Sequence, residues 1–356
     1  MTLVLFVILA TLLFTYTNGF HDTANSIATV VSTKVLTPRQ AILLATVFNL
    51  IGALFGTAVA KTVGVGLVKT ECITLHTLLA AMMAAIIWNL VTWYLGLPSS
   101  SSHGLIGGLC GAAIASTHGN WSVVIWSSVD PVKHTHNGVL YKVILPMLTS
   151  PVAGLILGFL IMTGLYYWLR DWRPGTVHSI FGRLQIVSAS FMGCAHGFND
   201  AQKTMGIITL ALFTATTNGN LDHLPSIFGF LKTPEFTIAR WVQILCGITM
   251  AAGTAAGGWR IIRTLGHKMV RLQPVHGFAA ETSAATILTL TAIWGMPVST
   301  THAITTSIMG VGMAKRFNAL KLGLVERIVW AWVLTLPAAG AMGYGIVKVF
   351  QWTGWC

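Results

Sequence analysis

Charged residues are scarce in this sequence, and acidic residues are the scarcest. Only 8% of the 356 residues are charged, against about 25% in a typical soluble domain. Hydrophobic residues make up 54%, and the mean hydropathy is +0.74. Apolar runs near or above the roughly 18 residues that span a bilayer recur along the whole chain. These features exclude an ordinary soluble protein and predict an all-α polytopic membrane protein.

Cysteine is also sparse, and no signal-peptide pattern is present. The five cysteines are scattered and form no C-x-x-C pair, so we expect neither a disulfide framework nor a zinc site. The run Met1–Tyr16 lacks a basic start and a small-residue cleavage site, so we expect no removable signal peptide. The net charge is +12, and the Lys and Arg residues fall in the connections between apolar runs. Basic residues in such loops set the orientation of a membrane protein, so we do not expect a nucleic-acid partner.

One motif occurs twice inside long apolar segments. Gly19–Asn25 reads GFHDTAN, and Gly197–Lys203 reads GFNDAQK. Each copy places one carboxylate, Asp22 or Asp200, where membrane burial is expected. A charge at bilayer depth costs roughly 2.5–3.5 kcal/mol even on a lenient scale. The whole chain has nine acidic residues. Because two of them lie within apolar segments, we predict that these two acids are functional.

A second motif follows each copy of the first. Pro98–His103 reads PSSSSH and Pro297–His302 reads PVSTTH. Proline stops the incoming helix, and the hydroxyl residues behind it cap the outgoing one. Hydroxyls beside unpaired N–H groups at a helix N-terminus bind anions. The candidate substrate ligands are Ser100, Ser101, Ser102, Ser299, Thr300 and Thr301. The alternative interpretation is a pair of ordinary loop caps outside the membrane.

The shared order of the two motifs predicts an internal duplication. Asp22 and Asp200 lie 178 residues apart, and His103 and His302 lie 199 apart. We expect one transmembrane repeat at 1–170 and a second at 171–356. If each proline break is the tip of a re-entrant hairpin, each half crosses the membrane three times. An odd number of crossings inverts the second repeat relative to the first.

The apolar pattern predicts corresponding elements in the two halves. The Asp motifs lie in the segments Thr2–Val35 and Phe181–Phe213, where the buried polar patch predicts a broken or kinked signature helix. The other expected elements are a span at Gln40–Ala60, a hairpin at Leu75–Ser116, spans at Leu140–Leu169 and Phe236–Trp259, a hairpin at His276–Met313 and a span at Val325–Phe350.

This topology assigns the basic residues unequally to the two membrane faces. Seven lie on the face of the N-terminus: Lys61, Lys69, Lys133, Lys142, Lys232, Arg240 and Lys348. Thirteen lie on the opposite face: Lys34, Arg39, Arg170, Arg173, Arg183, Arg260, Arg263, Lys268, Arg271, Lys315, Arg316, Lys321 and Arg327. The positive-inside rule makes the richer face cytoplasmic. We therefore expect both termini outside the cell.

Carboxylates beside an anion site require a cation between them and the substrate. A proton, sodium or a divalent metal at Asp22 and Asp200 would couple two binding events. Asn25 and Lys203 occupy equivalent positions; the Asn25 amide can ligate sodium, whereas the Lys203 ammonium replaces an ion's charge. This difference favours proton coupling. Lys203 could instead bind substrate oxygens or pair with Asp200.

The remaining polar residues of the motifs give weaker signals. They are His21, Asn199, Gln202, His103 and His302. The histidines could relay protons or simply donate hydrogen bonds within the protein. Glu281 is a third acid in a hairpin arm, but its equivalent in the first half is Met82, so it is not a symmetric part of the site.

These motifs resemble the inorganic phosphate transporter (PiT) family, whose signature reads approximately G-x-N-D-x-A-N. The resemblance covers essentially the whole chain. It implies an inverted-repeat protein of the inner membrane, a homodimer in membrane lipid, which moves phosphate by cation symport. His21 and the pair Gln202–Lys203 depart from the signature and are similar to the bacterial low-affinity, proton-coupled branch, which takes up neutral metal–phosphate complexes. No cofactor and no fixed metal are implied.

Alternative functions use the same residues differently. A sodium-coupled phosphate symporter or a sulfate permease would keep the site and change the ion or the anion. A membrane hydrolase would use Ser100 and His103, but two near-equivalent copies argue against a single nucleophile. An anion channel fits poorly with buried paired acids. We therefore predict a transporter rather than an enzyme.

Overall fold

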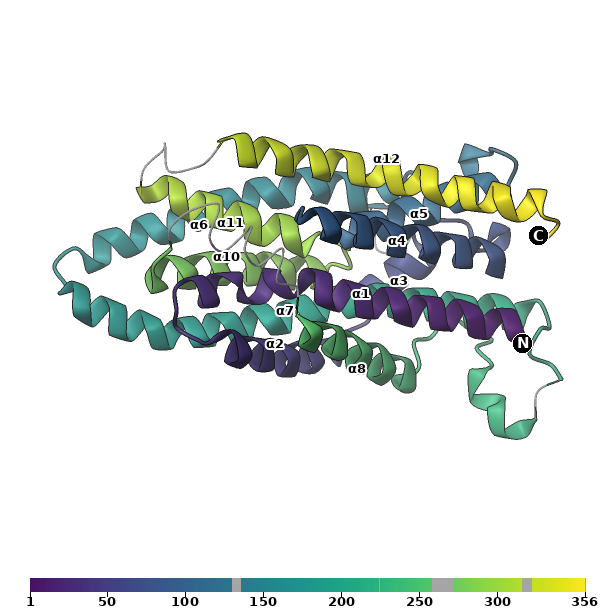
Figure 1. Cartoon of the computed structure of the whole chain (residues 1–356). Helices are drawn as coiled ribbons and strands as arrows, with labels where there is room; N and C mark the ends of the chain where they lie inside the picture. The colour runs from purple at the N-terminus through teal and green to yellow at the C-terminus, as the bar shows by residue number, and fades with distance from the viewer. Residues whose placement is uncertain (130–135, 224, 258–271, 316–321, 356) are drawn as a thin grey trace.

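A computed structural model of the chain describes residues 1–129, 136–223, 225–257, 272–315 and 322–355. Long helices dominate these residues (Figure 1). The first half contains α1 (Thr2–Ser32), α2 (Pro38–Ala53), α3 (Ala58–Val65), α4 (Leu75–Leu95), α5 (Ser101–Ser116), the π-helical turn η3 (Leu140–Ile144) and α6 (Leu145–Leu169). The second half contains α7 (Pro174–Thr217), α8 (Arg240–Ala256), α10 (Pro274–Ile293), α11 (Thr300–Lys315) and α12 (Leu322–Trp352). The short 3-10 helices are η1 (Thr70–Cys72), η2 (Trp121–Val123) and η4 (Ser226–Leu231).

Both proline breaks are the tips of helical hairpins. Thr77 near the start of α4 and Ser116 at the end of α5 lie with their hydroxyl oxygens 2.7 Å apart, so α5 returns along α4. Ser283 of α10 and Ser307 of α11 are joined in the same way at 3.1 Å. In Figure 1 the α4–α5 hairpin occupies the right half of the molecule and the α10–α11 hairpin the left half. The two hairpins therefore point toward each other.

The long helices also run in opposite directions in the two halves. In Figure 1, α1 runs from the N-terminus at the right toward the left, whereas α7 runs from left to right. The end of α12 lies at the same end of the molecule as the N-terminus. The predicted boundary at residue 170 falls in the connection between α6 and α7.

The predicted break in the signature helices is wrong. α1 is one continuous helix of 31 residues, and α7 is one of 44 residues that passes through the second Asp motif. Several side chains of the polar patch find hydrogen-bond partners while the backbone stays helical. Thr17 and Thr23 donate to carbonyls of α1 itself, at Phe14 and Gly19, and the acids bind neighbouring elements.

The segment predicted as one span, Gln40–Ala60, is not a single straight helix. The segment is two helices, α2 and α3, bent by 72° at the residues between them. Gly56 lies in this bend with a φ of +65°, a left-handed conformation that glycine adopts without strain. An apolar run can hide such a bend, because hydrophobicity does not reveal backbone direction.

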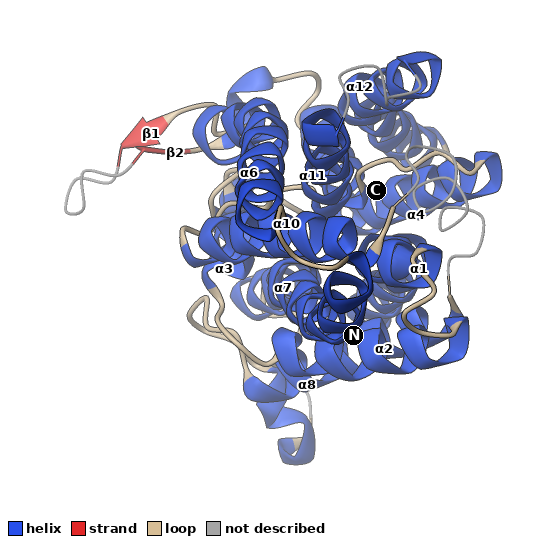
Figure 2. Cartoon of the chain, turned by 90° about the vertical axis from the view of Figure 1, so that its left-hand side faces the viewer, coloured by secondary structure: helices blue, strands red, loops and turns tan. Residues whose placement is uncertain are grey.

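Four helices among the described residues are long and apolar enough to cross a membrane: Thr2–Ser32, Leu75–Leu95, Leu140–Leu169 and Val325–Trp352. The bent pair α2–α3 makes a fifth if it is one span. Figure 2 looks along the bundle and shows the strands β1 (Ser128–Val129) and β2 (His136–Asn137) projecting from its side. Seven of the basic residues used to predict the orientation lie outside the described residues: Lys133, Arg260, Arg263, Lys268, Arg271, Arg316 and Lys321. Trp259 and the side chain of Lys315 also lie outside them.

Glycine brings the outgoing hairpin helices into backbone contact with neighbouring helices. A Cβ on Gly107 of α5 would lie 2.5 Å from the Leu336 carbonyl oxygen of α12, and Gly111 meets Gly340 more closely still. On the other hairpin, a Cβ on Gly158 of α6 would lie 2.6 Å from the Ser307 carbonyl oxygen of α11. Only glycine permits such close approach of two helices. α5 is thereby fixed to α12, and α11 to α6.

Candidate functional site

The two hairpin tips meet beside both repeated acids. The Ser102 hydroxyl of the first tip lies 3.3 Å from the Val298 carbonyl oxygen of the second. The Asp22 carboxylate of α1 accepts hydrogen bonds from Ser101 at 2.6 Å and from Thr301 at 3.3 Å. One carboxylate therefore joins α1 to both tips, at full burial.

The second acid forms the matching arrangement on α7. Asp200 accepts a hydrogen bond from Thr300 of the second tip at 3.4 Å. Lys203, one turn further along α7, donates to Asp200, to Ser102 and, at 3.1 Å, to the Val298 carbonyl oxygen. Lys203 is 1% exposed, so both of the roles predicted for it, pairing with Asp200 and contact with the tips, are compatible with its position.

Asn25 contacts only the second tip. Its amide nitrogen donates to Thr300 at 3.2 Å and to Thr301 at 2.9 Å. Its carbonyl oxygen is buried and has no hydrogen-bond partner among the described residues. An amide oxygen left unpaired in a buried site is an available cation or water ligand, because leaving such a group unpaired costs roughly 1–3 kcal/mol.

Ser100 and Ser299 act as helix caps. The Ser100 hydroxyl accepts from the backbone N–H of His103 at 3.2 Å, and the Ser299 hydroxyl accepts from His302 at the same distance. These two residues satisfy N–H groups that would otherwise remain free at the helix starts. The next two residues of each tip are better placed to contact a substrate, because Ser101, Thr300 and Thr301 donate to the acids and Ser102 accepts from Lys203.

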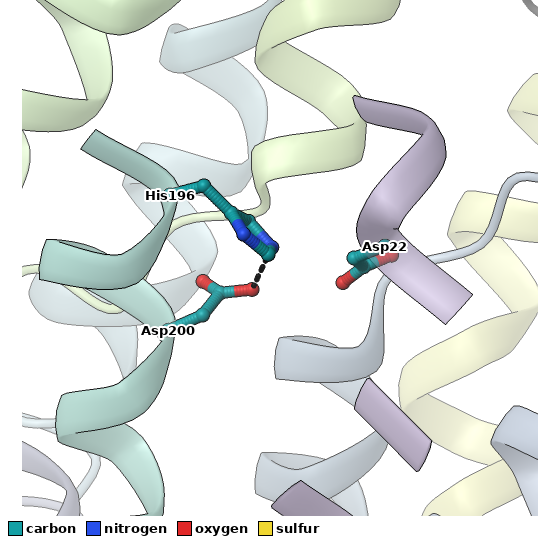
Figure 3. A group of neighbouring side chains, drawn as sticks. All are labelled: Asp22, His196 and Asp200. Atoms are coloured by element: carbon teal, nitrogen blue, oxygen red, sulfur yellow. Dashed lines mark ion pairs between the residues drawn. The ribbon is translucent and has the colours of Figure 1, made fainter. Parts of the chain in front are cut away.

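His196 belongs to this site and was missed from the sequence. It precedes Asp200 by one helical turn on α7, and its Nε2 atom lies 3.4 Å from the Asp200 carboxylate (Figure 3). One ligand atom from each of Asp22, His196 and Asp200 lies within 4.8 Å of the others, and all three residues are buried. The i, i+4 spacing to Asp200 is the signal that could have identified it.

A chain of hydrogen bonds fixes the orientation of the His196 ring. The Thr254 hydroxyl donates to the Met250 carbonyl, so it accepts from the Asn49 amide nitrogen at 2.9 Å. Asn49 then presents its carbonyl oxygen to His196 Nδ1, also at 2.9 Å. Nδ1 must therefore carry a proton. In the neutral ring Nε2 is left as a lone pair that faces carboxylates, an arrangement that a bound cation or a proton would stabilise.

Three other predicted site residues have buried polar atoms with no hydrogen-bond partner among the described residues. Both amide atoms of Asn199 are buried and have no partner in the described part of the chain. The same holds for the ring nitrogens of His103 and His302, whose rings lie 5.0 Å apart across the two tips. His21 differs, because its Nδ1 donates to Asp22 at 2.9 Å and its Nε2 lies 3.2 Å from the Thr92 hydroxyl. His21 therefore positions Asp22.

Glu281 lies away from the tips, in a separate polar cluster. It accepts hydrogen bonds from Thr29 at 2.5 Å, from Gln185 at 3.1 Å and from Ser188. Thr29 lies one helical turn beyond Asn25 on α1. The equivalent acid position in the first half is Met82, in the apolar core. That Glu281 is not a symmetric part of the site stays a prediction.

Gln202 has a structural contact instead of a place among the tips. Its carbonyl oxygen accepts from the backbone N–H groups of Val59 and Ala60 at the start of α3, at 2.9 and 3.4 Å. Its amide nitrogen donates to the Phe198 carbonyl at 2.7 Å. Gln202 thus caps α3 and holds it against α7.

We expect Gln202→Ala to weaken the protein rather than its substrate site. The substitution leaves two N–H groups at the start of α3 without an acceptor, which costs about 1–2 kcal/mol by analogy with helix caps. Thermal unfolding of the purified protein in detergent should begin at a lower temperature, while the apparent affinity for substrate stays near the wild-type value. A changed affinity with unchanged unfolding would show that Gln202 contacts the substrate instead.

A helical bundle in which two opposed, capped hairpin tips meet at buried acids defines a membrane transporter with its binding site inside the bundle. A model described as the phosphate transporter family matches residues 18–177 and 169–343. The chain belongs to this family, and it is a multi-pass membrane protein and not an enzyme.

Related proteins agree with this assignment. The chain is 44% identical to a probable low-affinity inorganic phosphate transporter of Rhizobium meliloti, over 92% of this chain and 90% of the relative. It is 39% identical to a protein of the same description in Bacillus subtilis, over 96% and 95% of the two chains. A solved structure described as the sodium-dependent phosphate transporter has the same fold, with a TM-score of 0.82, 23% identity and 99% coverage of both chains.

Proposed function

We propose that this protein imports inorganic phosphate, held between the two hairpin tips, by symport with protons. The observation that carries the proposal is the meeting of Ser101, Ser102, Thr300 and Thr301 beside Asp22 and Asp200. Hydroxyls at the starts of two helices suit a tetrahedral oxyanion, and the helix dipoles favour its charge.

The charges of the site support coupling to a cation. Asp22 and Asp200 together carry two negative charges when ionised, and Lys203 supplies one positive charge. An incoming phosphate adds further negative charge in a buried site, where like charges repel strongly. Protons taken up with the substrate would remove this repulsion. Because Lys203 occupies the position equivalent to Asn25, a sodium ion there is disfavoured, although a sodium-coupled mechanism remains the alternative.

A divalent metal would satisfy the same requirement as part of the cargo. The donor set consists of two carboxylates and the Nε2 lone pair of His196. It suits ions such as Mn²⁺ or Zn²⁺, whereas sodium binds imidazole nitrogen only weakly. We propose that such an ion is carried with phosphate as a neutral complex. Asp22, His196 and Asp200 would bind the metal, and the tip hydroxyls would bind the phosphate oxygens.

The proposal includes the arrangement of the chain in the membrane. We propose two inverted repeats, 1–170 and 171–356, supported by the opposite directions of α1 and α7 and by the opposed hairpins (Figure 1). The larger number of basic residues on the face opposite the termini supports an orientation in the inner membrane with both termini outside. The family resemblance adds a homodimer embedded in lipid, which size measurement of the purified protein tests.

The deciding experiment is uptake of radiolabelled phosphate into vesicles that contain the purified protein. A pH gradient, acid outside, should drive accumulation, whereas a sodium gradient alone should not. Labelled Mn²⁺ should enter together with phosphate, and His196→Asn should reduce the entry of both at low Mn²⁺ concentration, with recovery when Mn²⁺ is raised. Excess sulfate should compete poorly.

The outcomes separate the parts of the proposal. Uptake that follows the sodium gradient and ignores pH would replace proton coupling with sodium coupling. Uptake of sulfate in place of phosphate would overturn the substrate. Proton-driven phosphate uptake without Mn²⁺ entry would remove the metal from the cargo and leave the rest intact.

A further inference from the structure

An apolar cavity of about 760 Å³ lies outside the transport site, between α5 and α12. The segment between α5 and α6 closes its third side through Trp121, Trp126 and Ile144. Its volume falls within the roughly 300–1,000 Å³ of ordinary ligand sites. Cys110 and Leu336 line it from the facing helices. A cavity of this size within a tightly packed bundle calls for an occupant.

The lining of the cavity favours a hydrocarbon chain. Its walls are formed by aliphatic and aromatic side chains and by glycine, including the contact glycines Gly107, Gly111 and Gly340. Apolar cavities exclude water and bind apolar molecules. Ala341 and Tyr344 at its rim are exposed on the outer face of α12, a helix long and apolar enough to cross the membrane. The cavity is therefore open toward the bilayer.

Aromatic side chains line the rim, and one basic side chain, Lys348, lies beside it. Trp121 and Trp126 stack with ring centroids 6.2 Å apart, and Trp126 Nε1 donates to the Trp121 carbonyl at 3.2 Å. Lys348 lies one turn beyond Tyr344 on α12, with its ammonium nitrogen 5.6 Å from the Tyr344 ring centroid. Trp and Tyr side chains concentrate at the depth of lipid headgroups, where a lysine attracts anionic lipid.

We propose that this cavity binds one acyl chain of an anionic phospholipid from the surrounding bilayer, with the headgroup at Lys348. The charge of Lys348 and the open side of the cavity select a lipid over a soluble ligand. The chain would lie against α5, the helix that begins at the first hairpin tip. This binding site is independent of which ion drives transport.

Photo-crosslinking tests the proposal directly. The purified full chain is placed in nanodiscs with phosphatidylglycerol that carries a diazirine on its acyl chain, and labelled peptides are mapped by mass spectrometry. Labels should concentrate on α5 and α12 at the cavity walls. Ala341→Trp, which fills the cavity from α12, should remove most of this labelling, and Cys110→Phe should do the same from α5. Val329→Trp, an exposed α12 position outside the lining, is the matched control.

The headgroup is tested separately from the chain. Replacing diazirine phosphatidylglycerol with the corresponding phosphatidylcholine should reduce cavity labelling about fivefold, the effect of one lysine near anionic lipid. Lys348→Gln should abolish this preference, and Lys348→Arg should keep it. Equal labelling of wild type and both filled variants would overturn the site. Lipid labels on other exposed positions of α12 with none on the cavity walls would also overturn it.

Discussion

Asp22→Asn is expected to abolish phosphate uptake while the protein still inserts and folds. The carboxylate accepts hydrogen bonds from Ser101 of the first tip and Thr301 of the second, so it is the direct link between both hairpins and α1. Asparagine has nearly the same shape, but it has no charge to attract a proton or metal. The NH₂ group of the asparagine is a donor, and it would face the Ser101 or Thr301 hydroxyl, which donates a hydrogen bond to Asp22 in the wild type.

The expected loss is large because both interactions are charge-assisted. Hydrogen bonds to a charged group contribute about 1.5–3 kcal/mol each. Loss of the charge weakens both bonds to Asp22, which corresponds to a decrease of about a hundredfold or more in the uptake rate. Asp200→Asn should behave in the same way. Initial rates in vesicles with equal amounts of inserted protein provide the measurement.

Asp171→Asn is the matched control for this prediction. Asp171 has 83% of its side chain exposed and pairs with Arg170 at the surface, so the same chemical change there should leave uptake near the wild-type rate. Retained transport in Asp22→Asn, with the pH dependence of the wild type, would contradict the coupling role of the acid.

Lys203→Asn is expected to make transport responsive to sodium. The substitution gives the second half the residue that the first half has at Asn25, and it supplies an amide oxygen beside Asp200. Removal of the ammonium also leaves Asp200 as an uncompensated buried charge, and breaking such a pair costs about 3–5 kcal/mol. A sodium ion can restore that compensation.

Uptake by Lys203→Asn should therefore be very low without sodium and rise when sodium is added, whereas the wild type should not respond. Size-exclusion profiles with and without sodium show whether the variant is folded. Lys232→Asn serves as control, since Lys232 is a partly exposed residue that pairs with Asp222 at 3.5 Å. A folded, active variant that ignores sodium would show that Lys203 does not replace an ion.

The two hairpins could be predicted from the sequence because their signals are local. A proline followed by capping hydroxyls between apolar arms specifies a helix stop and a helix start, and Ser100 and Ser299 cap as expected. The repeated acids were recognisable because a carboxylate in an apolar run is costly. The structure brings these four segments together.

Other features depend on contacts between distant segments and leave little trace in the sequence. The helix through Asp22 is continuous because Thr17 and Thr23 bond to carbonyls of the same helix, whereas Asp22 and Asn25 find partners in the hairpin tips. The bend at Gly56 follows from backbone geometry that an apolar pattern does not encode. His196 acquires its orientation from Asn49 and Thr254, two residues on other helices. Gln202 lies in the second Asp motif, yet its carbonyl oxygen caps the start of α3.

The glycine contacts of the hairpins restrict how the molecule can change shape. α5 belongs to the first half but touches α12 of the second, backbone to backbone, and α11 of the second half touches α6 of the first. Such contacts have no side chain that could change rotamer and let the helices slide past each other. The halves are interlocked at two places. We therefore expect alternation between inward and outward access to move α5 together with α12 and α11 together with α6, instead of one half rocking rigidly against the other.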